Sequence, residues 1–459
     1  MLGKILHPEI EQMIRQRRFA ELRNTLMELH PLDIADVLQQ VPPKEKAIVF
    51  RLLPKSLAAD AIEHMPSLEQ RRLIRSLGQK EVAEVLNEMT PDDRTALLED
   101  LPEPVAAKIL KILSPAEYCI AAQLLAYPPE SVGRRMTTHF VAIKPTWTVS
   151  RTLQHLRHVG KALETMDTLY VTDDTGKLVD DIHLREIVLA DPHTTVAQLM
   201  NGHYVAVTAR DDQETAVRVF QQSGHTALPV VDEHGILVGI ITADAVLKIA
   251  QTESTEDILK LGAAESLGGP YLQVSLMHMV KRRAGWLCAL FLGEMLTATA
   301  MGFYEGEIAR AVVLALFIPL VISSGGNSGS QATTLIIRAM ALNHLTLKDW
   351  IKVMRRELLA GLMLGSILGS IAFVRIALWP SRVRLYGEHY LLVALTVGTA
   401  LVGVVMFGTL MGSLLPFLLR KLGFDPAVSS APFVATLVDV TGLIIYFTVA
   451  SLILRGIIL

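Results

Sequence analysis

The stretch PLVISSGGNSGSQATTLIIRAM, residues 319–340, indicates what kind of protein this chain is. Its residues 323–334 are twelve consecutive small or polar residues inside an apolar run that is long enough to cross a bilayer. A backbone loosened by three glycines is tolerated at membrane depth only where neighbouring helices cover it or where it lines a wet cavity. Tight packing between helices would explain the glycines. It does not explain Asn327 and Gln331, which lie four residues apart on one helical face and need polar partners.

The C-terminal part of the chain as a whole is apolar. Of 459 residues, 51% are hydrophobic and 19% charged, and the mean hydropathy of +0.38 is too high for a soluble protein of this length. We predict an all-α transmembrane domain over 284–459 with five spans, at 284–304, 308–342, 357–379, 390–418 and 431–454. Lys and Arg near the span ends favour a multi-pass protein of the inner (cytoplasmic) membrane, with a cytoplasmic N-terminus and a periplasmic C-terminus.

Charge is divided unequally along the chain. Residues 281–459 hold 15 of the 43 Lys and Arg and 8 of the 46 Asp and Glu, a net charge of about +7, which leaves about −10 for residues 1–280. An acidic soluble part argues against nucleic-acid binding. Cys119 and Cys288 imply no disulfide framework. A Walker-type phosphate loop and a Ser, Cys or His arrangement for covalent catalysis are both missing, so we expect no ATP-driven pump and no enzyme.

A twelve-residue repeat organises residues 1–130. Apolar residues recur at that spacing, each followed by Pro, Gly, Thr or Ser, at Val41, Leu53, Met65, Leu77, Met89, Leu101 and Leu113. Each unit is expected to be a short helix that ends at a breaker or cap and has an apolar face it cannot bury alone. We therefore predict an α-helical, superhelical N domain, whose simplest role is structural or regulatory.

A different duplication follows. Residues 136–143 recur 64 residues later, and TLYVTDDTGKLV (168–179) parallels ALPVVDEHGILV (227–238), each a strand, an Asp/Gly turn and a second strand. The pattern resembles a tandem cystathionine-β-synthase-type (CBS) α/β pair, with the first copy at 131–199 and the second at 200–250.

The sequence of this pair allows for one nucleotide-binding site. The second copy has Gly239, Thr242 and Asp244, which look like the G-x-x-T-x-D signature that holds a nucleotide ribose in such modules. The first copy has Asp180, His183 and Arg185 at those places. ATP is therefore a candidate ligand at Thr242 and Asp244, and a second site is not expected.

Residues 251–283 form the predicted connection to the membrane. They begin acidic, continue as an amphipathic stretch and end basic, which is typical of one connecting helix. The simplest interpretation of Glu253, Glu256 and Asp257 is that they complement the dipole at its start.

Two carboxylates lie in the predicted spans. Asp439 comes about eight residues into the fifth span, and an ionisable group there is a functional hypothesis by default. Glu294 in the first span is either a second membrane acid or a hydrogen-bond partner for packing. An acid among amides and hydroxyls is an oxygen-ligand site for a hard cation, of which Mg²⁺ fits best. One Asp per chain supplies too little negative charge for a divalent ion, and a two-fold dimer would supply two such carboxylates.

These segments together resemble the MgtE family of bacterial magnesium channels. The most specific matches are 319–340, GFDPAVSSAPFVATLVDVTGLIIY (423–446) and TESTEDILKLGA (252–263). The resemblance implies a homodimer in the bilayer, a plug helix over 251–283, and a pore formed by the second and fifth spans of both chains. It also implies that Asp439 recognises hydrated Mg²⁺ and that groups around Ala435, Gly326 and Asn327 complete the path.

The resemblance further implies regulation, in which Mg²⁺ bound among acidic faces of the N, CBS and plug elements holds the pore shut. The matching sensor positions are Asp60, Asp92, Asp212, Asp244, Glu253, Glu256 and Asp257. Four positions expected to be acidic are not, namely Ala96, Gly224, Ala245 and Lys248. Lys248 is the sharpest departure, because it puts a positive charge where a bridging cation would sit. We expect fewer sensor ions and lower affinity, or closure by another trigger.

The sequence thus predicts a multidomain membrane protein that is a Mg²⁺-selective channel gated by cytosolic Mg²⁺. One alternative is a carrier that exchanges Mg²⁺ or Co²⁺ for H⁺ or Na⁺, with Glu294 as the coupling acid. A second is a membrane-anchored nucleotide or metal sensor, which would have little reason to bury Asp439 and the polar residues 325–331.

Overall fold

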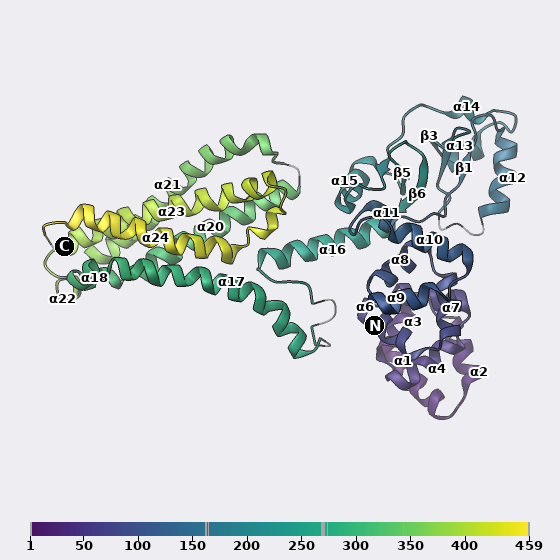
Figure 1. Cartoon of the computed structure of the whole chain (residues 1–459), viewed down its shortest axis with the longest axis horizontal. Helices are drawn as coiled ribbons and strands as arrows, with labels where there is room; N and C mark the ends of the chain where they lie inside the picture. The colour runs from purple at the N-terminus through teal and green to yellow at the C-terminus, as the bar shows by residue number, and fades with distance from the viewer. Residues whose placement is uncertain are drawn as a thin grey trace. The chain divides into compact units, whose positions relative to one another are not determined.

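The computed structural model describes residues 2–160, 163, 165–267, 271–272, 274–342 and 344–457. The chain divides into two compact units, Met1–Glu253 and Ser254–Leu459, and each is described by itself. Figure 1 shows a helical part and a strand-containing part in the first unit and long helices in the second.

The N-terminal part of the first unit is a stack of short helices. They are α1 (Leu2–Arg15), α2 (Phe19–Met27), α3 (Pro31–Gln40), α4 (Pro43–Leu52), α5 (Lys55–Glu63), α6 (Ser67–Ser76), α7 (Gln79–Glu88), α8 (Pro91–Glu99), α9 (Glu103–Leu110) and α10 (Pro115–Leu125). The repeat residues Val41, Leu53 and Met89 are the buried C-caps of α3, α4 and α7, and Leu77, the C-cap of α6, is partly buried against the same core. Each helix therefore ends by turning its last apolar side chain into the shared core, which confirms the predicted N domain.

The next part consists of two copies of one α/β unit. The strands are β1 (Ala142–Ile143), β2 (Thr168–Thr172), β3 (Leu178–His183), β4 (Val207–Thr208), β5 (Ala227–Val231) and β6 (Leu237–Thr242), and the helices are α11 (Val132–Arg135), α12 (Val149–Val159), α13 (Leu184–Leu189), α14 (Val196–Leu199) and α15 (Gln213–Ser223). In the described residues each copy has a three-stranded sheet, with its first pair parallel and its second antiparallel. The equivalent registers Thr168↔His183 and Ala227↔Thr242 confirm the duplication.

The predicted Asp/Gly turns join the strands of each copy. The carboxylate of Asp173 accepts backbone hydrogen bonds two and four residues ahead, and Asp232 does the same in the second copy. Gly176 and Gly235 follow with φ of +86° and +81°, which favours glycine. The two turns also pair with each other, because Leu178 N donates to Gly235 O at 3.0 Å and the N–H of the equivalent Leu237 donates to Gly176 O at 3.1 Å.

The connection differs from the single helix expected over 251–283. Helix α16 (Ala243–Leu261) begins directly after β6 and ends before Ala263, whose φ of +53° cannot continue a helix. The following long helix, α17, begins at Leu276, and residues 268–270 and 273 lie outside the described residues. The basic end of the predicted helix, residues 281–283, therefore belongs to the start of the first apolar helix.

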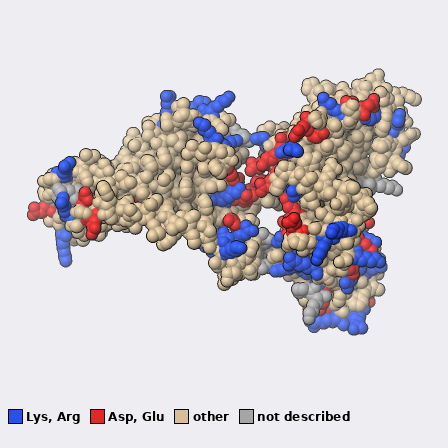
Figure 2. All heavy atoms as spheres, viewed as in Figure 1, with Lys and Arg blue, Asp and Glu red and all other residues tan. Residues whose placement is uncertain are grey.

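The described part of the second unit contains five helices long and apolar enough to cross a membrane, in agreement with the five predicted spans. They are built from α17 (Leu276–Phe303), α20 (Ile318–Ala341), α21 (Trp350–Ala377), α23 (Tyr390–Lys421) and α24 (Ala431–Leu454), joined through α18 (Glu305–Arg310), α19 (Val312–Ala315), η2 (Leu347–Asp349), α22 (Arg382–Tyr386) and η3 (Pro426–Val428). Figure 2 shows the charged side chains of this unit gathered toward its ends, with an uncharged middle.

Glycines allow α20 and α23 to approach closely. A methyl group added at Gly329 would lie 2.9 Å from Gly408 O, and one added at Gly412 would overlap the carbonyl oxygen of Gly329. A similar contact joins α21 to α23, since a methyl group at Gly365 would lie 2.8 Å from Val402 Cα. The glycines of the polar stretch thus have the packing role that small residues have between membrane helices.

We expect Gly412→Ala to destabilise the membrane unit by about 1–3 kcal/mol, because the added methyl group meets backbone rather than a movable side chain. The thermal midpoint of the detergent-solubilised protein, followed by size-exclusion chromatography after heating, measures the effect. Gly302→Ala in α17 is the matched control, because open space surrounds that position. Equal midpoints for the two variants would contradict the close-packing argument.

Candidate functional site

Helices α20 and α24 bring three of the expected pore residues together. A methyl group added at Gly326 would lie 3.4 Å from Ala435 Cβ and 3.8 Å from Asp439 Oδ1. Gly326 is buried in this contact, and Asp439 is half-buried beside it. Because Gly326 and Ala435 have little or no side chain, the Asp439 carboxylate lies close to the backbone of α20.

The fourth expected pore residue, Asn327, lies on a different face of α20. Ser323, Asn327, Gln331 and Thr334 are all exposed, at spacings of three or four residues, and we call them the polar strip. Asn327 Nδ2 donates to Ser323 Oγ at 3.4 Å, a local bond within the strip. Polar side chains at this depth are costly against lipid, so the strip needs a protein or water partner outside the single chain.

Glu294 belongs to the same site as Asp439, although its position in the sequence did not indicate this. Its carboxyl group lies within hydrogen-bonding reach of Asp439. The two helices that carry these acids pack closely, since a methyl group at Gly293 would lie 2.9 Å from Thr436 Cγ2. Two neighbouring carboxylates in a low-dielectric region are stable only with a cation or a proton between them. In the described ranges no cluster of three or more His, Cys, Asp or Glu suits a metal ion, so this pair is a partial ligand set.

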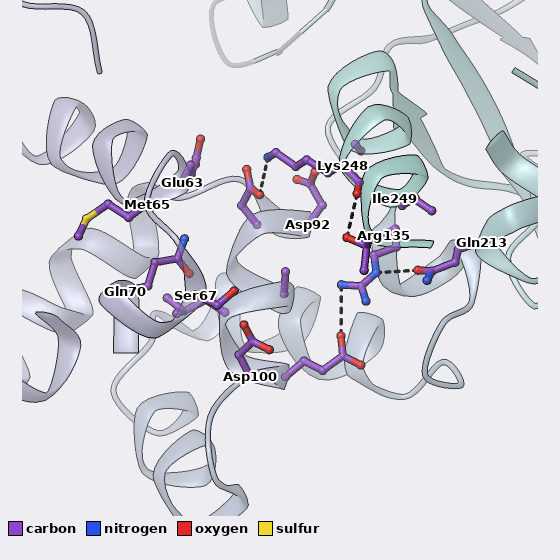
Figure 3. A pocket seen from close by; sticks show the side chains of 16 residues that line it. Glu63, Met65, Ser67, Gln70, Asp92, Asp100, Arg135, Gln213, Lys248 and Ile249 are labelled. Carbon is purple, nitrogen blue, oxygen red and sulfur yellow. Dashed lines mark hydrogen bonds and ion pairs between the residues drawn. The ribbon is translucent and has the colours of Figure 1, made fainter. Parts of the chain in front are cut away.

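A second candidate site lies in the first unit, in a cavity of about 350 Å³ (Figure 3). The cavity is lined by residues from α5, α6, α8 and α16, with Arg135 and Gln213 at one side. Its charged residues are Glu63, Asp92, Asp93, Glu99, Asp100, Arg135 and Lys248. Acids thus outnumber bases around it.

The electrostatics of this cavity are those of crowded, buried carboxylates. Burial, with Asp93 nearby, raises the pKa of Glu63 to about 8 and the pKa of Asp92 to about 6. Burial alone would lower the pKa of Lys248, but Asp93, Asp244 and Asp92 together outweigh it and the pKa is raised. The charged form of the lysine is therefore held by its acidic neighbours.

The seven expected sensor acids do not form one cluster. Asp92 lines the cavity, and Asp60 is exposed but close enough to Glu63 to raise its pKa. The Asp212 carboxylate caps α15 through Glu214 N at 2.8 Å, and Glu253 accepts a hydrogen bond from the Gln213 side chain. Both acids therefore have structural partners.

The remaining three sensor acids lie on α16. Asp244 Oδ1 accepts a hydrogen bond from the Thr242 hydroxyl at 2.6 Å. Glu256 pairs with Lys260 at 2.6 Å, and the same lysine pairs with Asp425 at 2.6 Å. Burial raises the pKa of Asp257, and Asp425 adds to the shift.

Three of the four non-acidic departures line the cavity with Asp92, namely Ala96, Ala245 and Lys248. The fourth, Gly224, ends α15 with φ of +68°, a conformation that suits glycine. Sequence reasoning missed Glu63, Asp93 and Asp425. Asp93 directly follows Asp92 in the first turn of a helix, which is a weak signal. Glu63 joins the cavity, and Asp425 joins Lys260 and Asp257, only through tertiary folding.

The two copies of the α/β unit differ at their nucleotide-type positions. Thr242 is buried with its hydroxyl engaged by Asp244. In the first copy Asp180 is fully buried and accepts hydrogen bonds from Asn201 N at 2.8 Å and Gly202 N at 2.9 Å. Asp180 therefore fixes the segment that links the copies.

Soluble helical and CBS-like domains, joined to five apolar helices that bring a carboxylate against small residues, define a multi-span cation-transport protein. Three families match: the divalent cation transporter MgtE at residues 318–449, the MgtE intracellular N domain at 29–130, and the CBS domain at 196–251. The magnesium transporter MgtE of Thermus thermophilus is 37% identical over 98% of both chains, and that of Bacillus subtilis is 27% identical over 96% of this chain and 95% of the relative. The chain belongs to the MgtE family.

Two solved structures resemble the soluble part. The cytosolic domain of the Mg²⁺ channel MgtE in complex with ATP is 32% identical, with a TM-score of 0.51, and the match covers 53% of this chain and all of that one. The soluble part of a magnesium transporter is 26% identical, with a TM-score of 0.52, and the match covers 55% and 99%. Both agree with the predicted helical domain followed by a CBS pair.

We expect the Glu294 and Asp439 carboxyl groups to be energetically coupled. In Mg²⁺-free buffer, Glu294→Gln should raise the thermal midpoint of the purified protein, because it removes like-charge repulsion, and the gain should vanish in an Asp439→Asn background. The coupling energy should be about 0.5–3 kcal/mol. Glu305→Gln, an exposed acid at the start of α18, is the control. Additive effects in the double variant would show that the two acids do not interact.

Proposed function

We propose that this chain carries Mg²⁺ across the membrane along a path lined by α20 and α24, and that Asp439 is the group that recognises the ion. The single observation that carries this proposal is the contact of Gly326 and Ala435 beside the Asp439 carboxylate. Membership of the MgtE family, with a relative named as a magnesium transporter that matches over 98% of the chain, supplies the identity of the ion.

The chemistry of Mg²⁺ suits this arrangement. The ion releases its water slowly and is bound by few carboxylates with several waters retained. A carboxylate can accept hydrogen bonds from the coordinated waters of such an ion without replacing them. The backbone and amide oxygens near Gly326 and Asn327 are the further acceptors. The membrane potential drives entry, since it contributes about 2.3 kcal/mol per charge for each 100 mV.

The pore is proposed to form between two copies of the chain. One Asp439 per chain does not match two positive charges, and the polar strip is exposed in the single chain. A two-fold dimer would bring two such carboxylates to one axis and cover polar groups that lipid cannot satisfy. This homodimer is a proposal that rests on those two features.

The protein is a membrane protein, and we propose the bacterial inner membrane with the N-terminus in the cytoplasm and the C-terminus in the periplasm. Support comes from the ten Lys and Arg near one set of span ends against five near the other. The domain limits 1–130, 131–199, 200–250, 251–283 and 284–459 are retained as proposals, with α16 rather than the whole of 251–283 as the helical part of the connection.

Regulation by cytosolic Mg²⁺ through the N and CBS parts is also proposed. The acids that would take part are Asp60, Asp92, Asp212, Asp244, Glu253, Glu256 and Asp257. ATP remains a proposed ligand at Thr242 and Asp244, where the Thr242 hydroxyl and a ribose would compete for the same carboxylate. We propose no catalytic step and no nucleic-acid partner.

A coupled carrier is the second candidate, because Glu294 lies beside Asp439 and could exchange a proton while Asp439 binds the ion. Patch recordings separate the two functions. A channel passes unitary Mg²⁺ currents at symmetrical pH, whereas a carrier of Mg²⁺ or Co²⁺ coupled to H⁺ or Na⁺ does not. A membrane-anchored sensor would give neither current nor uptake.

We expect Asp439→Ala and Asp439→Asn to abolish growth rescue of a Mg²⁺-import-deficient bacterium, down to the level of empty vector. The control is Glu388→Gln, an exposed acid outside the spans, which should rescue as the wild type does. Membrane expression must be matched among the variants. Rescue by both Asp439 variants would show that the ion path lies elsewhere.

A further inference from the structure

Lys248 joins two helices that are far apart in the sequence. It extends from α16 into the cavity (Figure 3). Its Nζ lies 2.8 Å from Asp93 Oδ1 on α8 and 3.8 Å from Asp244 Oδ2. Residues 93 and 248 belong to the helical N-terminal part and to the helix after the second α/β copy. The pair therefore bridges the two parts of the first unit.

The carboxylates around Lys248 depend on it for positive charge. The other base of the cavity, Arg135, is engaged by Glu99 at 3.3 Å and by Gln213 Oε1 at 3.0 Å. Among the described residues, Lys248 is the basic side chain whose charge acts to lower the pKa of both Glu63 and Asp92. The ammonium group thus faces three crowded acids, Glu63, Asp92 and Asp93.

Asp92 supplies an independent observation. Its side chain is 7% exposed, and its Oδ1 has no hydrogen-bond partner in the described structure. A buried carboxylate oxygen of this kind is costly unless a positive charge compensates it. The nearby ammonium group of Lys248 provides this compensating charge, so neither a water molecule nor a bound ion is needed for it.

A bridging Mg²⁺ does not fit this cavity. Mg²⁺ requires near-octahedral oxygen ligands at close range. Ala96 and Ala245 contribute no side-chain oxygen there, and the Lys248 ammonium group already occupies the side of Asp93 that an ion would share. A divalent ion next to that ammonium group would be repelled.

We propose that Lys248 is a built-in substitute for a bridging divalent cation, which holds α8 against α16 whatever the Mg²⁺ concentration. This contact then stays closed when Mg²⁺ falls, so any response of the protein to Mg²⁺ must arise at the other five proposed sensor acids and not at Asp92 or Asp244, which flank Lys248. The inference deepens the proposed regulation and takes its biological meaning from the proposed transport function.

The same arrangement recurs in the second unit. Lys260 Nζ lies 2.6 Å from Glu256 Oε1 and 2.6 Å from Asp425 Oδ2, with Asp257 close by. Here too an ammonium group stands between carboxylates from segments far apart in the sequence. The chain therefore uses its own lysines at two places where acids of separate elements meet.

Hydrogen–deuterium exchange of the full-length protein in detergent tests the proposal. Peptides that cover α8 and the N-terminal half of α16 should exchange equally in EDTA and in excess Mg²⁺ in the wild type. In Lys248→Met the same peptides should exchange faster in EDTA, by up to about fivefold, which is the factor that the loss of a partly exposed ion pair of 1 kcal/mol gives. Added Mg²⁺ should restore protection in this variant, because the acids are then free to share an ion.

Two controls accompany this variant. Lys80→Met removes the same charge from an exposed site on α7 and should behave as the wild type does. Lys248→Arg keeps the charge and should remain protected in EDTA. The proposal is overturned if the wild type loses protection in EDTA, or if Lys248→Met exchanges as the wild type does. Exchange does not depend on ion flux, so failure of the uptake experiment would leave this result interpretable, and the reverse also holds.

Discussion

The cost of placing a carboxylate among membrane helices is the constraint on which the second unit depends. Asp439 is tolerated there only if its neighbouring residues are small and if a positive charge or a proton compensates its negative charge. Gly326 and Ala435 meet the first condition, and the adjacent Glu294 makes the second more demanding. The close approach of α20 to α23 through Gly329 and Gly412 holds α20 in the position that this site requires.

In the first unit the limiting interaction is repulsion between acids. Helices α5 and α8 bring Glu63, Asp92 and Asp93 to one cavity, and a chain with only carboxylates there would be pushed apart. Lys248 contributes a positive charge that belongs to the chain itself, through its ion pair with Asp93.

The periodic features of the chain could be predicted from sequence, because periodicity reports which faces are buried. The twelve-residue repeat gave the short helices, the 64-residue duplication gave the two sheets, and the apolar runs gave the five spans. The connecting helix was misjudged because charge pattern alone does not report backbone conformation, and Ala263 ends α16 with a left-handed φ. Lys248 stood out by its charge, but the ion pair with Asp93 depends on two elements 155 residues apart, which no local pattern encodes.

The candidate site residues also divide into those that a local pattern identifies and those that only tertiary contacts bring together. Asp439 was found because a single acid in an apolar span is a strong local signal. Its proximity to Glu294, like the engagement of Asp212 as a helix cap, is a property of tertiary contacts. Residue type therefore identified candidates, and three-dimensional neighbours decided which of them share a site.

The paired turns of the two α/β copies have a consequence for how this region arose and can change. Each copy completes the other's turn, through Leu178 N to Gly235 O and Leu237 N to Gly176 O. Loss of one copy would leave a backbone donor of the other without its protein partner. Because the bonds join backbone groups, the two copies can differ in their side chains and still depend on each other's turns.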